Sequence, residues 1–210
     1  MISHPDPETV LGELGDKVTA AISEAVRFAE LEFRKYRQMH PDWAAENAAR
    51  TFADLIHDWM WTVLKHRLDA LPHVNIIDKE PTRQISVQVQ SDSRLSYLLR
   101  FKLHHLDGRT SSYQTQSVID FEFQGTNRTF PGFGEVGLEA GYEWNKDART
   151  VGAAVISLRD GRDNIIWVHP LPAPEAKDDK VTRPMVPGPT SPTVGIQGVA
   201  TDEQAGSDQT

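Results

Sequence analysis

The chain has 210 residues, with 30 acidic and 22 basic side chains, 8 histidines and no cysteine, so its formal net charge is −8. The lack of cysteine excludes disulfide scaffolds and thiolate metal sites, and the negative charge argues against binding to nucleic acid, which requires neutralisation of phosphates. Because no run approaches the ~18 apolar residues of a membrane span and the first residues lack the pattern of a signal peptide, we expect a soluble, cytoplasmic protein without a membrane partner.

The first half of the chain has the periodicity of amphipathic helices. Apolar residues recur at spacings of three and four from Leu11 to Phe33 and again from Ala48 to Leu71, which is typical of helices with one buried face. Pro41 disfavours helical geometry at the residue before it and suits the first turn of a new helix. Because the connection at this proline is short, we predict that two long helices pack as an antiparallel hairpin over residues 8–71.

From residue 84 onward, apolar and polar residues alternate, which predicts strands. The predicted strands are 84–90, 94–106, 116–124, 135–144, 151–158 and 164–169. Asp107–Gly108 has the composition of a tight hairpin turn. Consecutive strands with short connections predict a five- to six-stranded antiparallel meander over residues 84–169, with one polar face and one apolar face that the helical hairpin covers. The predicted fold class is therefore α+β.

Composition changes sharply after His169. Residues 170–210 hold seven of the thirteen prolines and no aromatic residue, and their three basic and six acidic side chains give a net charge of −3. Such a segment cannot bury enough apolar surface to offset the entropy lost on ordering. We therefore predict a single domain over residues 1–169, followed by a disordered, Pro-rich acidic tail over residues 170–210.

Charged residues form two rows on the polar face of the predicted sheet. The basic row comprises Arg100, Lys102 and His104, and the acidic row comprises Asp120 and Glu122. Cross-strand ion pairing on a solvated surface is the ordinary interpretation of such rows. The alternative is a nuclease-like catalytic site in which Asp120 and Glu122 hold a divalent ion while Lys102 stabilises phosphate charge. In that motif Gln124 stands where a lysine is required.

Other polar and aromatic residues give weaker signals. Glu135, Glu139 and Glu143 alternate along one predicted strand, and we interpret them as a solubilising face. Trp59 fits the apolar stripe of its helix, whereas Trp61 and Trp43 do not. These two are candidates for a partner-binding surface, although Trp61 could equally cover the edge of the sheet. Outside the nuclease alternative, no spacing predicts a bound metal or a cofactor.

The favoured functional hypothesis is a non-enzymatic protein-interaction or regulatory module whose acidic tail orders on another protein. The first alternative is the divalent-metal-dependent nuclease-like enzyme. The second alternative is a small-ligand binder with a pocket between the helices and the sheet. The chain could also form a homo-oligomer through the apolar stripes of the helical hairpin.

Overall fold

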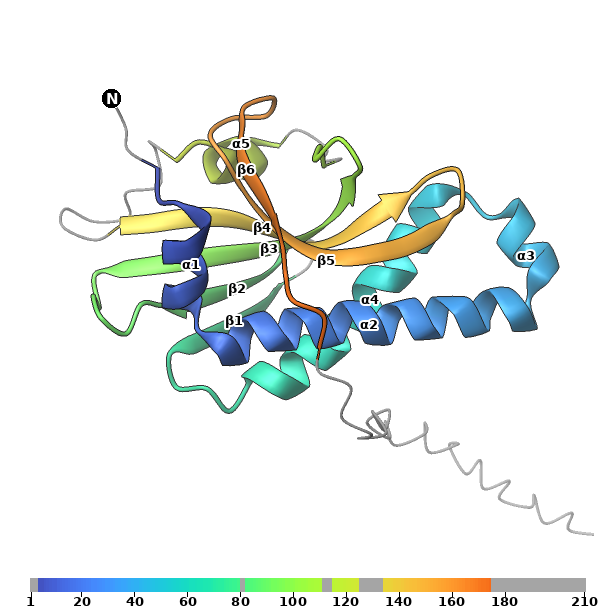
Figure 1. Cartoon of the computed structure of the whole chain (residues 1–210), viewed down its shortest axis with the longest axis horizontal. Helices are drawn as coiled ribbons and strands as arrows, with labels where there is room; N and C mark the ends of the chain where they lie inside the picture. Colours follow the sequence, from blue (N-terminus) through green and yellow to red (C-terminus); the bar gives the residue numbers. More distant parts are fainter. Residues whose placement is uncertain (1–3, 80–81, 111–114, 125–133, 175–210) are drawn as a thin grey trace, which may run out of the picture. The chain divides into compact units, whose positions relative to one another are not determined.

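The computed structural model describes residues 4–79, 82–110, 115–124 and 134–174, and all of them belong to one compact unit. These residues form an α+β fold in which helices precede a mostly antiparallel sheet (Figure 1). Beyond residue 174, the predicted tail lies outside the described residues. No helix in the described ranges is long and apolar enough to cross a membrane.

Within the described residues, four helices come first. They are α1 (Pro7–Leu14), α2 (Asp16–Met39), α3 (Pro41–Glu46) and α4 (Ala49–Leu68). The break predicted at Pro41 is confirmed. A second break, which the periodicity did not predict, lies at Gly15, whose φ of +79° favours glycine. The region predicted as two long helices is thus divided into four, among which α2 packs mainly against α4.

The sheet in the described part of the chain has six strands. They are β1 (Val74–Lys79), β2 (Thr82–Gln88), β3 (Leu95–His105), β4 (Gly134–Asn145), β5 (Thr150–Arg159) and β6 (Ile165–Pro170). Their spatial order follows the chain order. All neighbouring pairs are antiparallel except β3 and β4, which are parallel. The predicted purely antiparallel meander is therefore wrong at its centre, and β1 is a strand that the pattern did not predict.

The parallel pair follows from an element that the sequence pattern misassigned. Residues 116–124, predicted as a strand, contain the helix α5 (Gln116–Glu122). A segment of seven residues is too short for alternation to distinguish a strand from a helix. In the helix, Val118, Phe121 and Glu122 fall on one side, and Phe121 and Glu122 are buried. Parallel strands need a crossover connection, and α5 lies within it.

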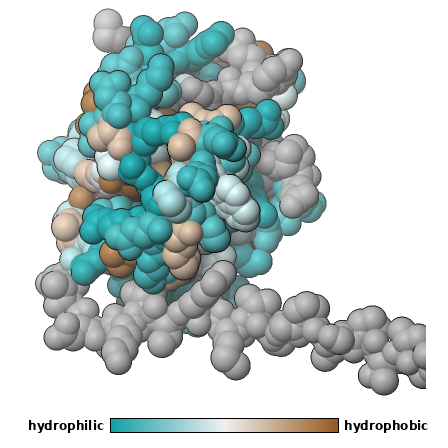
Figure 2. Space-filling view, turned by 90° about the vertical axis from the view of Figure 1, so that its right-hand side faces the viewer, coloured by the Kyte–Doolittle hydropathy of each residue, from teal (hydrophilic) through white to brown (hydrophobic). Residues whose placement is uncertain are grey.

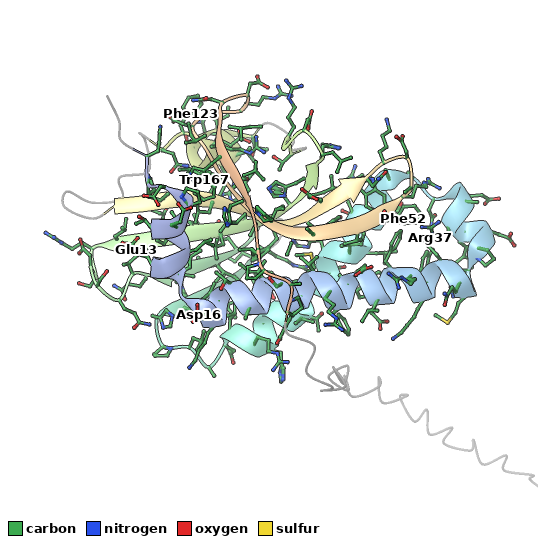
Figure 3. The ribbon with its side chains drawn as sticks, in the orientation of Figure 1. Glu13, Asp16, Arg37, Phe52, Phe123 and Trp167 are labelled. Carbon is green, nitrogen blue, oxygen red and sulfur yellow. The ribbon has the colours of Figure 1, made fainter. Side chains whose placement is uncertain are left out.

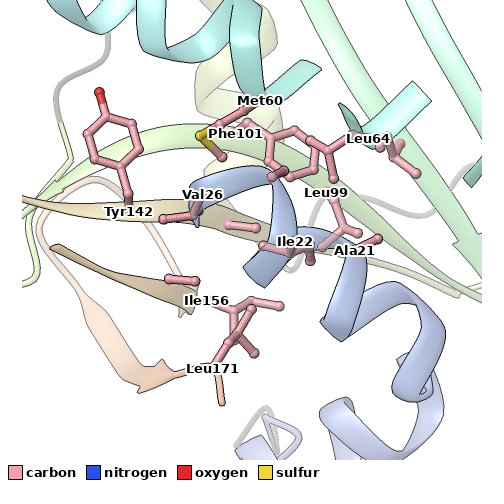
Figure 4. Packing of buried hydrophobic residues seen from close by; sticks show 14 of the residues in the cluster. Ala21, Ile22, Val26, Met60, Leu64, Leu99, Phe101, Tyr142, Ile156 and Leu171 are labelled. Atoms are coloured by element: carbon pink, nitrogen blue, oxygen red, sulfur yellow. The ribbon is translucent and has the colours of Figure 1, made fainter. Parts of the chain in front are cut away.

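The inner face of the sheet, which packs against α2 and α4, forms the hydrophobic core (Figure 4). Alternate residues of β3 and β5, including Leu99 and Ile156, meet Ile22 of α2 and Leu64 of α4, and each of these four side chains is fully buried. Leu171, immediately after β6, is also buried, and its N–H donates to the Ala154 carbonyl oxygen at 2.8 Å. The apolar face and its helical cover, both predicted from periodicity, are present.

Candidate functional site

Five polar side chains are buried together on the outer face of the sheet, which points away from α2 and α4. They are His104, Glu122, Glu139, Ser157 and Arg159, each at most 5% exposed, and we call them the outer-face cluster. In the strand register, Glu139 of β4 lies between Arg100 of β3 and Ser157 of β5. Alternate residues of three neighbouring strands therefore project to this face, and Glu122 joins them from α5.

An ion pair between Glu139 and Arg159 forms the centre of the outer-face cluster. Arg159 Nε donates to Glu139 Oε2 at 2.5 Å, and both side chains are 3% exposed. Thr110 Oγ1 also donates to Glu139 Oε2, at 2.8 Å, while Arg159 Nη2 donates to the Gly108 carbonyl oxygen. Buried charges are costly unless they are paired and hydrogen-bonded. The ion pair obtains these further bonds from the turn after β3 and so holds that turn over the sheet.

The turn after β3 has the form that Asp107–Gly108 predicted. Gly108 has a φ of +79°, and its N–H donates to the His105 carbonyl oxygen at 2.8 Å. The His105 N–H donates to the Arg109 carbonyl oxygen at 2.7 Å. The chain then returns as a single bridge between Thr110 and His104. The predicted tight turn is confirmed.

His104 is the neutral member of the outer-face cluster. Its Nε2 lies 3.0 Å from Ser157 Oγ, and Ser157 Oγ donates to the Glu139 carbonyl oxygen at 3.4 Å. Because the hydroxyl proton is used in that bond, Oγ accepts from Nε2–H, and Nδ1 is left as an acceptor. Nδ1 is buried without a hydrogen-bond partner among the described residues. Burial lowers the pKa of His104 to about 4, although the nearby Glu139 carboxylate opposes this shift.

Helix α5 lies on the opposite side of the sheet from α2 and covers part of the outer face (Figure 1). A Cβ atom at Gly137 would lie 2.7 Å from the Phe121 carbonyl oxygen and 3.2 Å from the Phe121 ring, so glycine permits this close packing. The Arg100 guanidinium carbon lies 4.2 Å from the centroid of the same ring. The outer face, predicted to be solvated, is therefore partly buried under this helix.

The structure separates the two carboxylates of the predicted catalytic site. Asp120 and Glu122 are two positions apart on α5, and such residues do not face each other on a helix. Asp120 is exposed and accepts a hydrogen bond from Gln116 Nε2 at 2.8 Å, whereas Glu122 is buried. Burial raises the pKa of Glu122 and lowers that of Lys102. The Lys102 charge in turn lowers the pKa of Glu122, and the Glu122 charge raises the pKa of Lys102. Lys102 thus lies near Glu122 but is not joined by Asp120.

The described residues of this face do not form a set of metal ligands. In the described ranges, no three His, Asp or Glu side chains gather in a way that could hold a metal ion. The carboxylate that most affects Glu122 is Glu139, which raises its pKa further, and Glu139 is already bonded to Arg159. The described residues therefore do not assemble the two-carboxylate arrangement that the nuclease hypothesis requires.

Gln124, which occupies the lysine position of the nuclease pattern, joins two strands. Its Nε2 donates to the carbonyl oxygens of Gly137, at 2.9 Å, and Arg159, at 2.7 Å. Its Oε1 accepts from the Gly137 N–H at 3.1 Å. The side-chain amide thus forms hydrogen bonds with the strand backbone as another peptide group would. These bonds give Gln124 a structural role at this position.

A cavity of about 320 Å³ opens beside the outer-face cluster, and we call it the outer groove. Its lining includes His104 of β3, Glu143 of β4 and Val155 of β5, together with Leu106 of the turn and Val168 of β6. Leu106 is 68% exposed and Val168 is 36% exposed, although both are large apolar residues. The outer groove therefore combines buried polar atoms with an exposed apolar rim.

The two tryptophans proposed as partner-binding residues lie in different environments. Trp43 of α3 is 60% exposed and stacks on the His40 ring with centroids 4.7 Å apart. Trp61 of α4 is 4% exposed and contacts Phe101 edge-on in the core. Trp61 thus packs against the sheet, which was the second of the two roles expected for it. Trp59, assigned to the buried stripe, is only partly buried, because the helix turns a neighbouring face toward the sheet.

The corner around α3 contains a second cavity, of about 210 Å³, lined in part by Arg37, Phe52 and Arg149. Arg37 and Phe52 are labelled in Figure 3. Arg149 donates to the carbonyl oxygens of Ala44 and Asn47 at 3.0 Å each. Its guanidinium group therefore holds α3 against the turn between β4 and β5. Figure 2 looks onto this side of the molecule and shows a mainly hydrophilic surface with separate hydrophobic spots. The corner is best explained as a structural contact.

Sequence reasoning placed Lys102, His104 and Glu122 among the polar residues of the sheet but missed the importance of three others. Glu139 was interpreted as solubilising, and Ser157 and Arg159 were not singled out. The sequence did contain a signal for this face of the strand. Ser157 and Arg159 alternate with Ile156 and Leu158, and they share their face with the apolar Val155. Their burial could not be predicted, since it depends on α5 and on the turn after β3.

Comparison with known proteins adds no further constraint. Neither the family models nor the curated proteins nor the solved structures that were compared match this chain.

Proposed function

We propose that the protein is a non-enzymatic binding module that holds another protein at the outer groove. The observation that supports this proposal is the exposed apolar rim, where Leu106 and Val168 border a cavity with buried polar atoms. Exposed apolar groups around a concave polar site are a common feature of binding surfaces. The volume of about 320 Å³ is at the small end of the ligand-pocket range of ~300–1,000 Å³, which suits one side chain of a partner.

The chemistry of the outer-face cluster favours binding over catalysis. Ser157 is fully buried and uses its proton in a bond to backbone, so it is not poised as a nucleophile. The Glu139 carboxylate is bonded to Arg159 and Thr110, which leaves it a weak candidate for a general base. The cluster instead fixes the turn that forms one wall of the outer groove.

The pocket proposed between the helices and the sheet has less support. Buried side chains from α2, α4 and the inner face of the sheet belong to one continuous hydrophobic cluster. The outer groove lies on the other face, so a ligand hypothesis for this chain is better directed there.

An affinity capture with the intact chain and two matched variants tests the proposal. The intact chain, the Leu106→Glu variant and the Leu31→Glu variant would be used to capture proteins from the native host. Leu31 lies on α2 and is 40% exposed, so this control adds the same charge away from the outer groove. We expect a captured protein to be lost with Leu106→Glu and retained with Leu31→Glu. Equal capture by all three would contradict the proposed groove.

A truncation separates the folded unit from the tail. Because β6 ends at Pro170 and Leu171 is buried, the chain should be cut after residue 174 to keep the sheet intact. If the proposed role of the acidic tail is correct, this truncation reduces capture while the unfolding temperature stays unchanged. If capture is retained in full, binding depends on the outer groove alone.

A further inference from the structure

Two residues that line the outer groove carry acceptor atoms for which no other described residue supplies a donor. His104 lines it and is fully buried, and its Nδ1 has no hydrogen-bond partner among the described residues. Glu143 of β4 lines the same cavity, is half-buried, and forms no ion pair with another described residue. Strand register places these two residues directly beside each other on β3 and β4. A neutral acceptor and an anionic acceptor therefore lie side by side.

We propose that the outer groove binds an alkylammonium group, and that its occupant is a lysine side chain of the partner protein. This inference depends on the proposed function, because it names the group that the partner inserts. An ammonium group has three donors and no acceptor. It can therefore satisfy His104 Nδ1 and the Glu143 carboxylate together, whereas a carboxylate or a phosphate would supply further acceptors to a site that already has them.

The tautomer of His104 fits this assignment. The Nε2 proton is directed to Ser157 Oγ, whose own proton is directed to the Glu139 carbonyl oxygen. These bonds leave Nδ1 without a proton and orient the ring. Burial also keeps the pKa of His104 low, so the imidazole does not repel a cation at neutral pH. The outer-face cluster thus prepares the acceptor before a ligand arrives.

The remaining lining suits the methylene stem of a lysine. Val155, Val168 and Pro170 contribute apolar surface to the cavity, and Leu106 lies at its rim. Lysine commonly buries its stem on apolar surface while its charge meets a polar group. This combination of apolar lining and two acceptors distinguishes an alkylammonium ligand from a small hydrated cation.

Two other charged side chains near the outer groove, on β5 and in the turn after β3, already have partners. Arg159 is bonded to Glu139 and to the Gly108 carbonyl oxygen. In the turn, Asp107 also lines the groove, but its carboxylate accepts from the Arg109 N–H at 3.0 Å and lies 3.9 Å from Arg109 Nε. Asp107 is thus partly compensated, and Glu143 is the carboxylate to which we assign recognition of the ammonium group.

A titration followed by NMR tests the ligand class with the full chain. The probes are N-acetyl-lysine methylamide, its norleucine counterpart, which lacks only the charged amine, and spermidine. Ionic strength is held constant, and the ring signals of His104 and the amide signal of Glu143 are recorded. We expect saturable shifts with the lysine probe and at least tenfold weaker binding of the norleucine probe.

Two variants link the binding to Glu143. Glu143→Gln removes the proposed partner of the cation, and Glu46→Gln removes the same charge from an exposed position on α3. We expect Glu143→Gln to weaken binding of the lysine probe at least fivefold and Glu46→Gln to leave it unchanged. An equal effect of both variants would show that only net charge matters and would overturn the inference.

The remaining outcomes are also decisive. If the lysine and norleucine probes bind equally, the cation assignment is wrong, yet loss of capture by Leu106→Glu would still support a protein-binding groove. If spermidine binds and the lysine probe does not, the source is a free polyamine and the assignment to a partner's lysine is wrong. If none of the probes binds, the inference is overturned, and the capture experiment alone decides the proposed function.

Discussion

Both faces of the sheet contain buried side chains, but the buried side chains differ in kind. On the inner face, the buried residues are apolar and meet α2 and α4 in one cluster (Figure 4). On the outer face, the buried residues include Glu139, Arg159 and His104, which meet α5 and the turn after β3. The inner face gains stability from removing apolar area from water. The outer face instead depends on pairing the charges that it buries, as in the ion pair between Glu139 and Arg159.

Breaking the central ion pair should have the largest effect. Glu139→Ala would leave the Arg159 guanidinium buried without its carboxylate, and removal of one partner from a buried pair costs about 3–5 kcal/mol. We expect the free energy of unfolding, measured by urea denaturation, to fall by this amount. Asp54→Ala is the control, because Asp54 faces Arg50 at 3.9 Å on an exposed surface, where a pair contributes about 0–1 kcal/mol.

A double variant sharpens the same contrast. Glu139→Leu combined with Arg159→Met replaces the ion pair with apolar side chains, and such replacements are often neutral or stabilising. We expect it to recover most of the stability lost in Glu139→Ala. A double variant as unstable as the single one would mean that the bonds to Thr110 and Gly108, rather than the unpaired charge, dominate the effect.

The matching change on the inner face is Leu99→Ala. Leu99 lies on β3 next to Arg100 but points into the core and is fully buried, and removal of a buried leucine side chain costs about 2–5 kcal/mol. We expect unfolding measurements to show this loss, whereas Leu31→Ala on the exposed side of α2 should change the free energy of unfolding by less than about 0.5 kcal/mol. Lysine-probe binding should survive in folded Leu99→Ala, since the outer groove lies on the opposite face.

The same contrast explains what could be predicted from the sequence. The inner face was predictable, because alternation such as Leu99 and Phe101 on β3 reports burial of one side of a strand, and the stripe from Leu11 to Phe33 reports its cover. The outer face was not, because Glu139 on a strand has the same local pattern whether it meets water or Arg159. The residue pattern reports only the polarity of Glu139. Its burial depends on the elements that pack over it, such as the turn after β3.

The element placed over the outer face was itself the main error in the predicted fold. Residues 116–124 alternate well enough to predict a strand, and that assignment put Asp120 and Glu122 on one face. Their separation follows directly from the helical period of α5. Trp61 illustrates the same limitation in α4, where the face that meets the core differs from the predicted stripe, so that Trp61 is buried and Trp59 is only partly buried.

Protonation of His104 offers a smaller test of the outer face. In the folded chain its pKa is lowered to about 4 from 6.5, so below pH 6.5 the unfolded chain binds the proton first. Stability associated with His104 is thus fully present above pH 6.5 and is lost as the pH falls toward 4, by about 3 kcal/mol at 1.36 kcal/mol per pKa unit.

The His104→Gln variant isolates this contribution. Glutamine can keep a bond to Ser157 and does not titrate, so between pH 7 and pH 4 the wild type should lose about 3 kcal/mol more stability than the variant. Urea denaturation at several pH values measures the difference, in which the other titrating groups cancel. Parallel pH profiles for the two chains would contradict a buried, neutral His104.

The smallest expected effect concerns the contact that brings α5 to the sheet. In Gly137→Ala, the added Cβ meets the Phe121 carbonyl oxygen at 2.7 Å, and backbone cannot move aside as a flexible side chain can. Overpacking of this kind costs about 1–3 kcal/mol. In the control Gly134→Ala, the Cβ meets only the side-chain Cδ1 of Leu95, at 3.3 Å, so a smaller change is expected.

Hydrogen exchange distinguishes local displacement of α5 from general destabilisation. The Gly161 N–H donates to the Glu122 carbonyl oxygen at 2.7 Å, so its exchange rate reports contact between α5 and the turn after β5. Gly137→Ala should accelerate exchange at Gly161 more than at Leu99 in the core, because α5 moves while the inner face stays packed. Equal acceleration at both sites would mean that the two faces unfold as one unit. The outer face would then be as integral to the fold as the hydrophobic core.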